Sequence, residues 1–208
     1  LADARAACAA RVGVAADRFA FVPNASQGVI AATAALLPAR DATIATASAN
    51  YGGVVLGLRE LARRRGATLR AFPTPSPERA TPAGWIDAVL DGARGADVLV
   101  VDQIVATTAQ HNPVGRLIPE LRRAAPGCRI VVDAAHAVGH LEPVVPRGVD
   151  AWVSNHHKWA CAPRASAALV CDTDEAAAAM APMAGSWDAE RAFPRNFDAQ
   201  GTDDVSSY

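Results

Sequence analysis

Lys158 is the residue of this sequence with the clearest capacity for covalent chemistry. It is the only lysine among 20 basic residues, and all the others are arginines. Arginine replaces lysine on a solvated surface but not as a nucleophile, because the guanidinium stays protonated. Lys158 follows two histidines and precedes Trp159, so neighbouring cations and partial burial would lower the pKa of its amine and favour Schiff-base formation. Codon bias, or a lysine that extends into solvent, explains the same residue without chemistry.

Asp133 places a carboxylate at the end of an apolar run. It follows Arg129-Ile130-Val131-Val132 and precedes Ala134-Ala135-His136. A carboxylate at the end of a central strand is poorly solvated and needs a cationic partner. A helix cap or a structural ion pair is the alternative interpretation of this residue.

The segment Pro23-Asn24-Ala25-Ser26-Gln27-Gly28 joins an expected strand to an expected helix. The start of a helix presents free backbone N–H groups and a positive end, which bind phosphate, and the Ser26 hydroxyl would add a donor. Asn and Ser are also favoured N-caps, so ordinary capping accounts for the segment equally well. It has neither the G-x-x-x-x-G-K pattern of a Walker loop nor G-x-G-x-x-G.

The histidines raise two alternative chemistries. His136 and His140 are spaced i, i+4, and His156, His157 and Cys161 follow about 20 residues later. Adjacent histidines do not easily point at one ion, and no carboxylate completes a set of catalytic ligands, so we expect no metal. A Ser-His-Asp hydrolase is disfavoured because the sequence has no G-x-S-x-G turn.

Composition narrows the class of protein. The 208 residues are 51% hydrophobic and carry a formal net charge of −1, which disfavours a basic nucleic-acid binder and an acidic disordered chain. The sequence has no run of 18 apolar residues, so we expect no membrane span. The four cysteines are widely spaced without a C-x-x-C pair, and with no secretory signal at the N-terminus this predicts a cytoplasmic protein with reduced thiols.

Short apolar runs alternate with longer amphipathic ones, which predicts an α/β fold. Continuously apolar runs such as Val98–Val101 are typical of a parallel sheet covered on both faces. We expect helices over 2–13, 28–37, 53–65, 83–91, 116–125 and 174–181, and strands over 19–22, 43–46, 68–72, 98–102, 129–133, 151–154 and 165–170. The three prolines of Pro73–Pro77 predict a surface loop.

The expected sheet brings the polar residues together. Ligands of open α/β sheets bind at the carboxyl ends of the strands. The loops expected there span 23–28, 47–53, 103–111, 133–139 and 155–158, and they hold most of the side chains capable of chemistry. The sequence therefore predicts a single site at that edge.

Five segments, taken in order, resemble the class V aminotransferase family of fold-type-I pyridoxal-phosphate enzymes, and within it the isopenicillin N epimerase-like branch. The segments are Phe21–Val29, Asn50–Val54, Asp102–Ala109, Val132–Gly139 and Asn155–Arg164, and Gly201–Asp204 closes the series. Each motif is weak alone. The ordered set covers nearly the whole chain, and it makes the resemblance specific.

The resemblance implies pyridoxal 5'-phosphate as the cofactor and gives roles to the matching residues. Lys158 resembles the lysine that forms the Schiff base, and Asp133 resembles the aspartate that keeps the pyridine nitrogen protonated. His136 and Thr108 are similar to residues near the phenolic oxygen of the cofactor. Tyr51 occupies the place of the aromatic residue or histidine that stacks on the ring. Lys158, Asp133 and His136 are the expected catalytic residues.

The phosphate contacts follow from the same resemblance. Ala25, Ser26, Asn155 and His157 resemble the residues of the phosphate cup. Gly201-Thr202 resembles the segment that reaches the phosphate of a partner subunit, which implies a homodimer with its sites at the interface.

The implied fold is the three-layer large domain of these enzymes, with a mostly parallel central sheet. We expect this domain over 1–182, N-terminally incomplete, and over 183–208 a loop at the active site and dimer interface that leads toward an absent C-terminal small domain. The implied activity is that of an epimerase or carbon–sulfur lyase acting at Cα and Cβ of an amino acid, with aminotransferase chemistry within the same family. An incomplete or non-catalytic chain of this fold is the second hypothesis, and a metal-dependent hydrolase the third.

Overall fold

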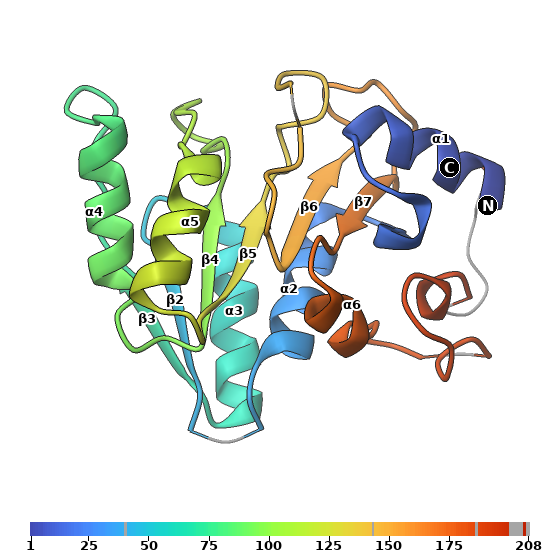
Figure 1. The fold of residues 1–208 in the computed structure, drawn as a ribbon, viewed down its shortest axis with the longest axis horizontal. Helices are drawn as coiled ribbons and strands as arrows, with labels where there is room; N and C mark the ends of the chain where they lie inside the picture. The colour runs from blue at the N-terminus through green and yellow to red at the C-terminus, as the bar shows by residue number, and fades with distance from the viewer. Residues whose placement is uncertain (40, 143, 186, 200–205, 207–208) are drawn as a thin grey trace.

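The computed structural model describes residues 1–39, 41–142, 144–185, 187–199 and 206. A seven-stranded sheet forms its centre, in the order β1-β7-β6-β5-β4-β2-β3 (Figure 1). The strands are β1 (Phe19–Val22), β2 (Thr43–Ala47), β3 (Thr68–Phe72), β4 (Val98–Asp102), β5 (Arg129–Asp133), β6 (Ala151–Asn155) and β7 (Ala167–Val170). The α/β fold predicted from the sequence is confirmed, and each predicted strand is present within two residues of its expected ends.

The sheet is mostly parallel. Strands β3, β2, β4, β5 and β6 pair in parallel, whereas β7 runs antiparallel to both of its neighbours, β6 and β1. The register places Asp102 beside Asp133 at the ends of β4 and β5. The carboxyl ends of five parallel strands therefore lie at one edge of the sheet, where a ligand site is expected.

Helices cover both faces of the sheet (Figure 1). They are α1 (Ala2–Val12), α2 (Ala25–Leu36), α3 (Gly52–Arg65), α4 (Pro82–Gly92), α5 (Val114–Ala124) and α6 (Asp174–Ala179), with short 3₁₀ turns η1 (Ala16–Arg18) and η2 (Arg195–Phe197). All six predicted helices are present. No helix in the described part of the chain is long and apolar enough to cross a membrane.

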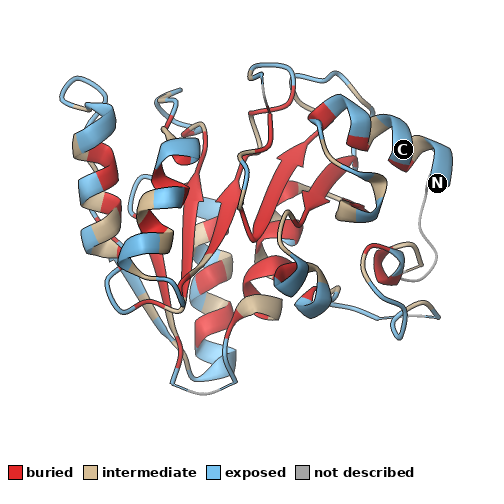
Figure 2. Ribbon diagram, viewed as in Figure 1, coloured by how far each residue is buried: buried red, intermediate tan, exposed pale blue. Residues whose placement is uncertain are grey.

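Alternation along the strands divides the core into two layers. On β4, Leu99 and Val101 belong to the layer that also holds residues of α1, α4 and α5, whereas Val98 and Val100 belong to the layer that holds residues of α2, α3 and α6. Successive side chains of a strand point to opposite faces, so one apolar run supplies both layers. Figure 2 shows the resulting pattern of buried strands between helices that are buried on one side and exposed on the other.

Helix α2 begins three residues earlier than the sequence pattern indicated. Asn24 is its N-cap, and the Asn24 side chain accepts a hydrogen bond from the Gln27 amide at 2.9 Å. The cap satisfies an amide of the first turn, which allows the helix to start directly after it. Ala25 and Ser26 therefore belong to the first turn of the helix and not to a loop.

The C-terminal segment has little regular structure where it is described. Asp198 forms an ion pair with Arg5 of α1, and the Asn196 side chain donates a hydrogen bond to the Met180 carbonyl at 2.8 Å. The division of the chain at residues 182 and 183 stays a prediction.

Asp150 forms a buried polar centre at the amino-terminal edge of the sheet, away from the ligand edge. Its side chain is fully buried and accepts hydrogen bonds from Arg122 at 2.6 Å, Arg129 at 3.2 Å and the Ile130 amide at 2.7 Å. These bonds connect α5 to the starts of β5 and β6. Asp150 is therefore a structural carboxylate.

We expect Asp150→Ala to lower the free energy of unfolding by about 3 kcal/mol, because it leaves a buried amide without its acceptor and two arginines without their carboxylate. Urea denaturation measures this loss. The matched control is Asp91→Ala, which removes the exposed ion pair with Arg94 and should change stability by less than about 0.5 kcal/mol. Equal losses in the two variants would contradict the structural role of Asp150.

Candidate active site

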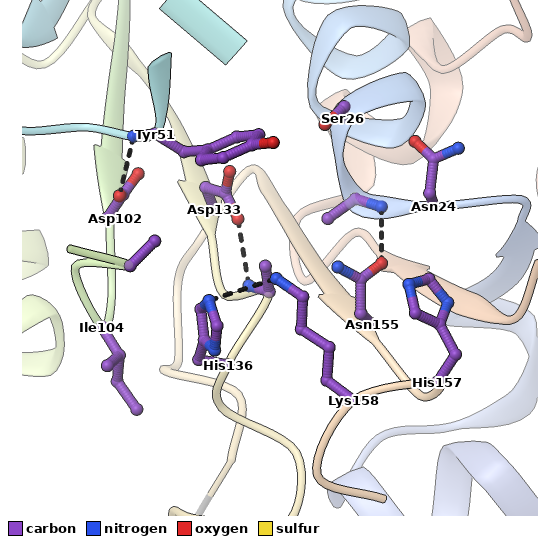
Figure 3. Close-up of a pocket in the computed structure, with 13 residues that line it drawn as sticks. Asn24, Ser26, Tyr51, Asp102, Ile104, Asp133, His136, Asn155, His157 and Lys158 are labelled. Atoms are coloured by element: carbon purple, nitrogen blue, oxygen red, sulfur yellow. Dashed lines mark hydrogen bonds between the residues drawn. The ribbon is translucent and has the colours of Figure 1, made fainter. Parts of the chain in front are cut away.

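A cavity of about 230 Å³ opens at the carboxyl edge of the sheet. Its walls come from the start of α2, the residue before α3, and the ends of β4, β5 and β6 with the turns that follow them. The lining residues are Asn24, Ala25, Ser26, Tyr51, Asp102, Ile104, Ala106, Asp133, Ala135, His136, Asn155, His157 and Lys158. Figure 3 shows how side chains from these separate segments face one another.

The start of α2 forms one side of the cavity. The Ala25 amide donates a hydrogen bond to Asn155 Oδ1 at 2.8 Å, which fixes the helix to the end of β6. Ser26 lies in the same turn and faces the cavity with its hydroxyl. The positive end of a 12-residue helix and nearby side-chain donors together suit an anion such as a phosphate.

Close packing positions this turn. A methyl group added at Gly28 would lie 2.5 Å from Val153 Cγ1, so the absence of a side chain lets α2 approach β6. The start of the helix therefore sits directly above the strand that leads to Lys158.

Two carboxylates lie side by side on the opposite wall. Asp133 is buried, and one of its oxygens accepts a hydrogen bond from the Ala135 amide at 3.0 Å. Burial raises its pKa to about 6, while the Ala135 bond and the charge of Lys158 oppose the rise. In Figure 3 the second oxygen of Asp133 points away from the Ala135 bond. Asp133 can thus accept a further bond from a group in the cavity.

Asp102 is the second carboxylate. It is 2% exposed, and its Oδ2 accepts a hydrogen bond from the Tyr51 amide at 3.1 Å, while Oδ1 is buried without a partner. Burial first, and then the charge of Asp133, raise the pKa of Asp102 to about 8. Burial and the neighbouring charge thus hold a proton on Asp102 to higher pH than on Asp133, so Asp133 is the first of the pair to ionise.

Lys158 extends its amine toward Asp133 and His136 (Figure 3). Its Nζ is 3.1 Å from His136 Nε2, and His136 Nδ1 accepts a hydrogen bond from the Trp159 indole at 3.0 Å. Burial lowers the pKa of the Lys158 amine, against the opposing charges of Asp133 and Asp102. The pKa of His136 is also lowered, first by burial and then by Lys158 and His140. A neutral amine is a nucleophile and a base.

The turn that carries Lys158 approaches a glycine. Gly139 has a φ of +93°, and a Cβ there would lie 2.6 Å from the Trp159 carbonyl oxygen. Only glycine suits this position, because both the backbone conformation and the space exclude a side chain. The turn after β5 thereby sits against the turn after β6, which brings His136 to Lys158.

The adjacent histidines point to different environments. His156 is buried against Phe19, with ring centroids 6.0 Å apart, and burial lowers its pKa to about 4. His157 lines the cavity, and its Nδ1 is 3.0 Å from the Ser166 carbonyl oxygen, which makes that nitrogen the donor. His157 therefore presents its Nε2 side to a ligand, whereas His156 supports the core.

Of the described residues that the sequence predicted for the site, all but Thr108 line the cavity. Thr108 is exposed in the tight turn between Ile104 and His111, whose other members include Ala109 at a φ of +57°. This turn directs Ile104 and Ala106 to the cavity and carries Thr108 away from it. Thr108 is thus not among the residues that line this cavity, and its assignment to the cofactor stays a prediction. Gly201 and Thr202 lie outside the described residues.

Sequence reasoning did not single out Asp102 or Trp159 as functional residues. Asp102 ends an apolar strand as Asp133 does, so the same signal was present in the sequence. The bond between Trp159 and His136 joins residues 23 apart, and no local pattern indicates it.

The described residues show no metal-binding cluster: no three His, Cys, Asp or Glu side chains among them gather into a group that could hold an ion. His136 and His140, the pair with helical spacing, instead meet through a contact of His140 Nδ1 with the His136 carbonyl at 3.0 Å.

These residues fit pyridoxal phosphate by their chemistry. The cofactor needs an amine for its aldehyde carbon, a carboxylate for its pyridine nitrogen and a cluster of donors for its phosphate. Lys158, Asp133 and the first turn of α2 supply these three around a single cavity. Fold and donor set together define a class of protein, the fold-type-I pyridoxal-phosphate enzymes.

The family follows from the sequence match. Residues 1–193 match the family described as Aminotransferase class-V, and the chain belongs to this family. Its cofactor is pyridoxal 5'-phosphate. The finer branch, that of isopenicillin N epimerase, stays a prediction.

Two relatives are rice proteins (Oryza sativa subsp. japonica). The chain is 31% identical over 133 residues to "Putative L-cysteine desulfhydrase 1" and 34% identical over 121 residues to the second protein of that name. The matches cover 60% and 54% of this chain, but 27% and 25% of the relatives. The chain thus spans about a quarter of the curated relatives that it matches.

Solved structures share the fold. The cystine C–S lyase C-DES, in complex with cysteine persulfide, superposes with a TM-score of 0.79 at 20% identity, over 90% of this chain and 49% of that one. A cysteine desulfurase from Thermococcus onnurineus NA1 gives a TM-score of 0.75 at 20% identity, over 99% and 52%. At this identity the likeness establishes the fold alone.

The raised pKa of Asp102 has a consequence for stability. The folded chain holds this proton more tightly than the unfolded chain, whose carboxyl has the ordinary pKa of 3.8. Stability therefore falls as the pH rises from about 4 to about 8, the window between the two pKa values. We expect Asp102→Asn to raise the free energy of unfolding of the cofactor-free chain by about 1–3 kcal/mol at pH 8.5.

The same variant should differ little from the wild type at about pH 3, below both pKa values, where Asp102 is protonated in the folded and in the unfolded chain. Urea unfolding at the two pH values measures the difference. An equal gain in the free energy of unfolding at both pH values would show that the substitution acts through packing and not through ionisation.

Proposed function

We propose that this chain is the cofactor-binding part of a pyridoxal-phosphate-dependent carbon–sulfur lyase that acts on an amino acid of the cysteine type. The observation that carries the proposal is the Lys158 amine, held by His136 in the cavity that Asp133 lines. The printed names of the two rice relatives, both L-cysteine desulfhydrases, support the choice of reaction.

The residues would hold the cofactor in a defined orientation. Lys158 would attach its aldehyde carbon, Asp133 would pair with its pyridine nitrogen, and Ser26 with the α2 turn would bind its phosphate. Tyr51, which is half exposed at the rim, would cover the ring. When bound, the cofactor supplies an electron sink that stabilises negative charge at Cα of the amino acid.

Lys158 is the base in this proposal. Its lowered pKa favours a free lone pair on Nζ, which is required to take the proton from Cα. His136 orients the amine through the 3.1 Å contact. Asp133 ionises at lower pH than Asp102 beside it, so Asp133 is the carboxylate of the pair that would carry the negative charge.

Epimerisation starts with removal of the same proton. It differs from lyase chemistry in the next step, because the proton returns to Cα and the bond from Cβ to sulfur stays intact. The non-catalytic hypothesis differs from both, since no proton would leave Cα at all. One experiment therefore separates the three.

The test is incubation of the purified chain with pyridoxal phosphate and L-cysteine in D2O. Release of sulfide, pyruvate and ammonia supports the lyase, and Lys158→Ala should stop it. Exchange of the Cα proton for deuterium with the bond from Cβ to sulfur intact and D-cysteine formed would replace the lyase with the epimerase. If the chain binds the cofactor but neither exchanges the Cα proton nor releases sulfide, the non-catalytic hypothesis is the one supported.

The homodimer and the cytoplasmic location belong to this proposal too. Sedimentation of the purified chain with and without cofactor tests the dimer. A monomer that binds the cofactor fully would contradict a site shared between subunits.

A further inference from the structure

Three side chains form a hydrogen-bonded row that ends on the Lys158 amine. The Trp159 indole nitrogen is 3.0 Å from His136 Nδ1, and His136 Nε2 is 3.1 Å from Lys158 Nζ (Figure 3 draws the second contact). His136 comes from the turn after β5, whereas Lys158 and Trp159 come from the turn after β6. The row therefore exists only because the fold joins these two turns.

The indole decides the direction of both bonds. An indole N–H is a donor only, so His136 Nδ1 must be the acceptor and carries no proton. The neutral imidazole then carries its proton on Nε2. A protonated imidazole would place a second N–H against the indole N–H, and the two donors would oppose each other.

The direction at His136 fixes the state of the lysine. With Nε2–H as the donor, Lys158 Nζ must accept. An ammonium has three donors and no acceptor, so only the neutral amine completes the row. Without the indole, His136 is free to take the other tautomer, in which Nε2 accepts a bond from the ammonium.

We propose that Trp159 is a positioning residue that fixes the Nε2–H tautomer of His136, so that His136 donates a hydrogen bond to the neutral amine of Lys158. The inference deepens the role of Lys158 as a base and rests on the proposed function only for its catalytic consequence. Trp159 itself does not line the cavity.

Other charged groups surround the lysine and must be counted. Asp133 from β5 and Asp102 from β4 favour the ammonium, and His157 lies on the same turn as Lys158. His140 contacts the Trp159 ring, with centroids 4.5 Å apart, and thus holds the indole in place. The carboxylates raise the pKa of Lys158, whereas the hydrogen bond from His136 lowers it, as burial does.

The single lysine makes the test direct. In the cofactor-free chain labelled with ¹³C at lysine Cε, one side-chain signal reports the titration of Lys158. We expect Trp159→Phe to raise the Lys158 pKa by about one unit, a tenfold change in the amine-to-ammonium ratio, because one hydrogen bond to the amine is lost. In ¹⁵N spectra of the histidines, His136 should lose its preference for Nε2–H.

Two controls separate the row from a general disturbance. Trp187→Phe makes the same change at a tryptophan that is 97% exposed, and it should leave the Lys158 titration unchanged. His136→Phe should raise the pKa at least as far as Trp159→Phe does. The double variant should then show no further rise, because Trp159 acts only through His136.

An unchanged Lys158 pKa in Trp159→Phe would overturn the proposal, as would shifts that add in the double variant. The measurement needs neither cofactor nor turnover, so it is independent of the reaction. A raised pKa in an inactive chain would refute the proposed function alone, and an active chain with an unchanged pKa would refute the positioning role alone.

Discussion

Replacing Lys158 with alanine is expected to abolish covalent attachment of pyridoxal phosphate. In the wild-type chain, mixing with the cofactor and reducing with borohydride should place a pyridoxyl group on the peptide that contains Lys158. Because this is the only lysine, the only competing amine is the N-terminus. Turnover should fall by a factor of about 10²–10⁴ as well, since the variant also loses its base. Peptide mass mapping and sulfide release measure the two effects.

Lys158→Arg is the matched control. It keeps the positive charge in the cavity, but a guanidinium stays protonated and attaches no aldehyde. We expect this variant to carry no pyridoxyl group at position 158, as in the alanine variant. Its guanidinium charge should still attract the phosphate of the cofactor. Labelling of the N-terminus alone in the wild-type chain would show that the cavity does not form the site.

Asp133→Asn should give the second large effect. The amide has the shape of the carboxylate but no charge to hold a proton on the pyridine nitrogen. We expect the rate of Cα proton exchange to fall by a factor on the order of 10²–10³, comparable to the loss of one preorganised electrostatic partner. Labelling of Lys158 should persist, because the amine is unchanged. Exchange kinetics in D2O and borohydride mapping measure the two separately.

The pH dependence of cofactor affinity tests the role of the Asp133 charge a second time. Burial raises the Asp133 pKa to about 6, so below that pH the carboxylate takes up a proton and loses its charge. Cofactor affinity of the wild-type chain should therefore decline as the pH falls through 6, and Asp133→Asn should lack this decline. A variant with wild-type exchange rates would refute the role of Asp133.

The position of the site followed from the sequence because its determinants are local. Apolar runs of four or five residues each ended in a polar residue, as at Asp133 and Asn155, and the parallel sheet gathers such ends at one edge. The uniqueness of Lys158 is likewise readable without coordinates. The start of α2 was placed too late, because the prediction followed the periodic pattern and did not use Asn24 as the N-cap.

The sequence by itself thus determined the order of the elements and the edge that holds the cavity, and it singled out the amine that we propose acts there, since these depend on side-chain pattern and type. Only the tertiary structure decided which groups tune that amine. The pairing of β4 with β5 set Asp102 beside Asp133, and the close approach at Gly139 brought His136 between Lys158 and Trp159. A tight turn carried Thr108 away from the cavity. Such contacts join residues distant in sequence, and their distances follow from packing and not from any local propensity.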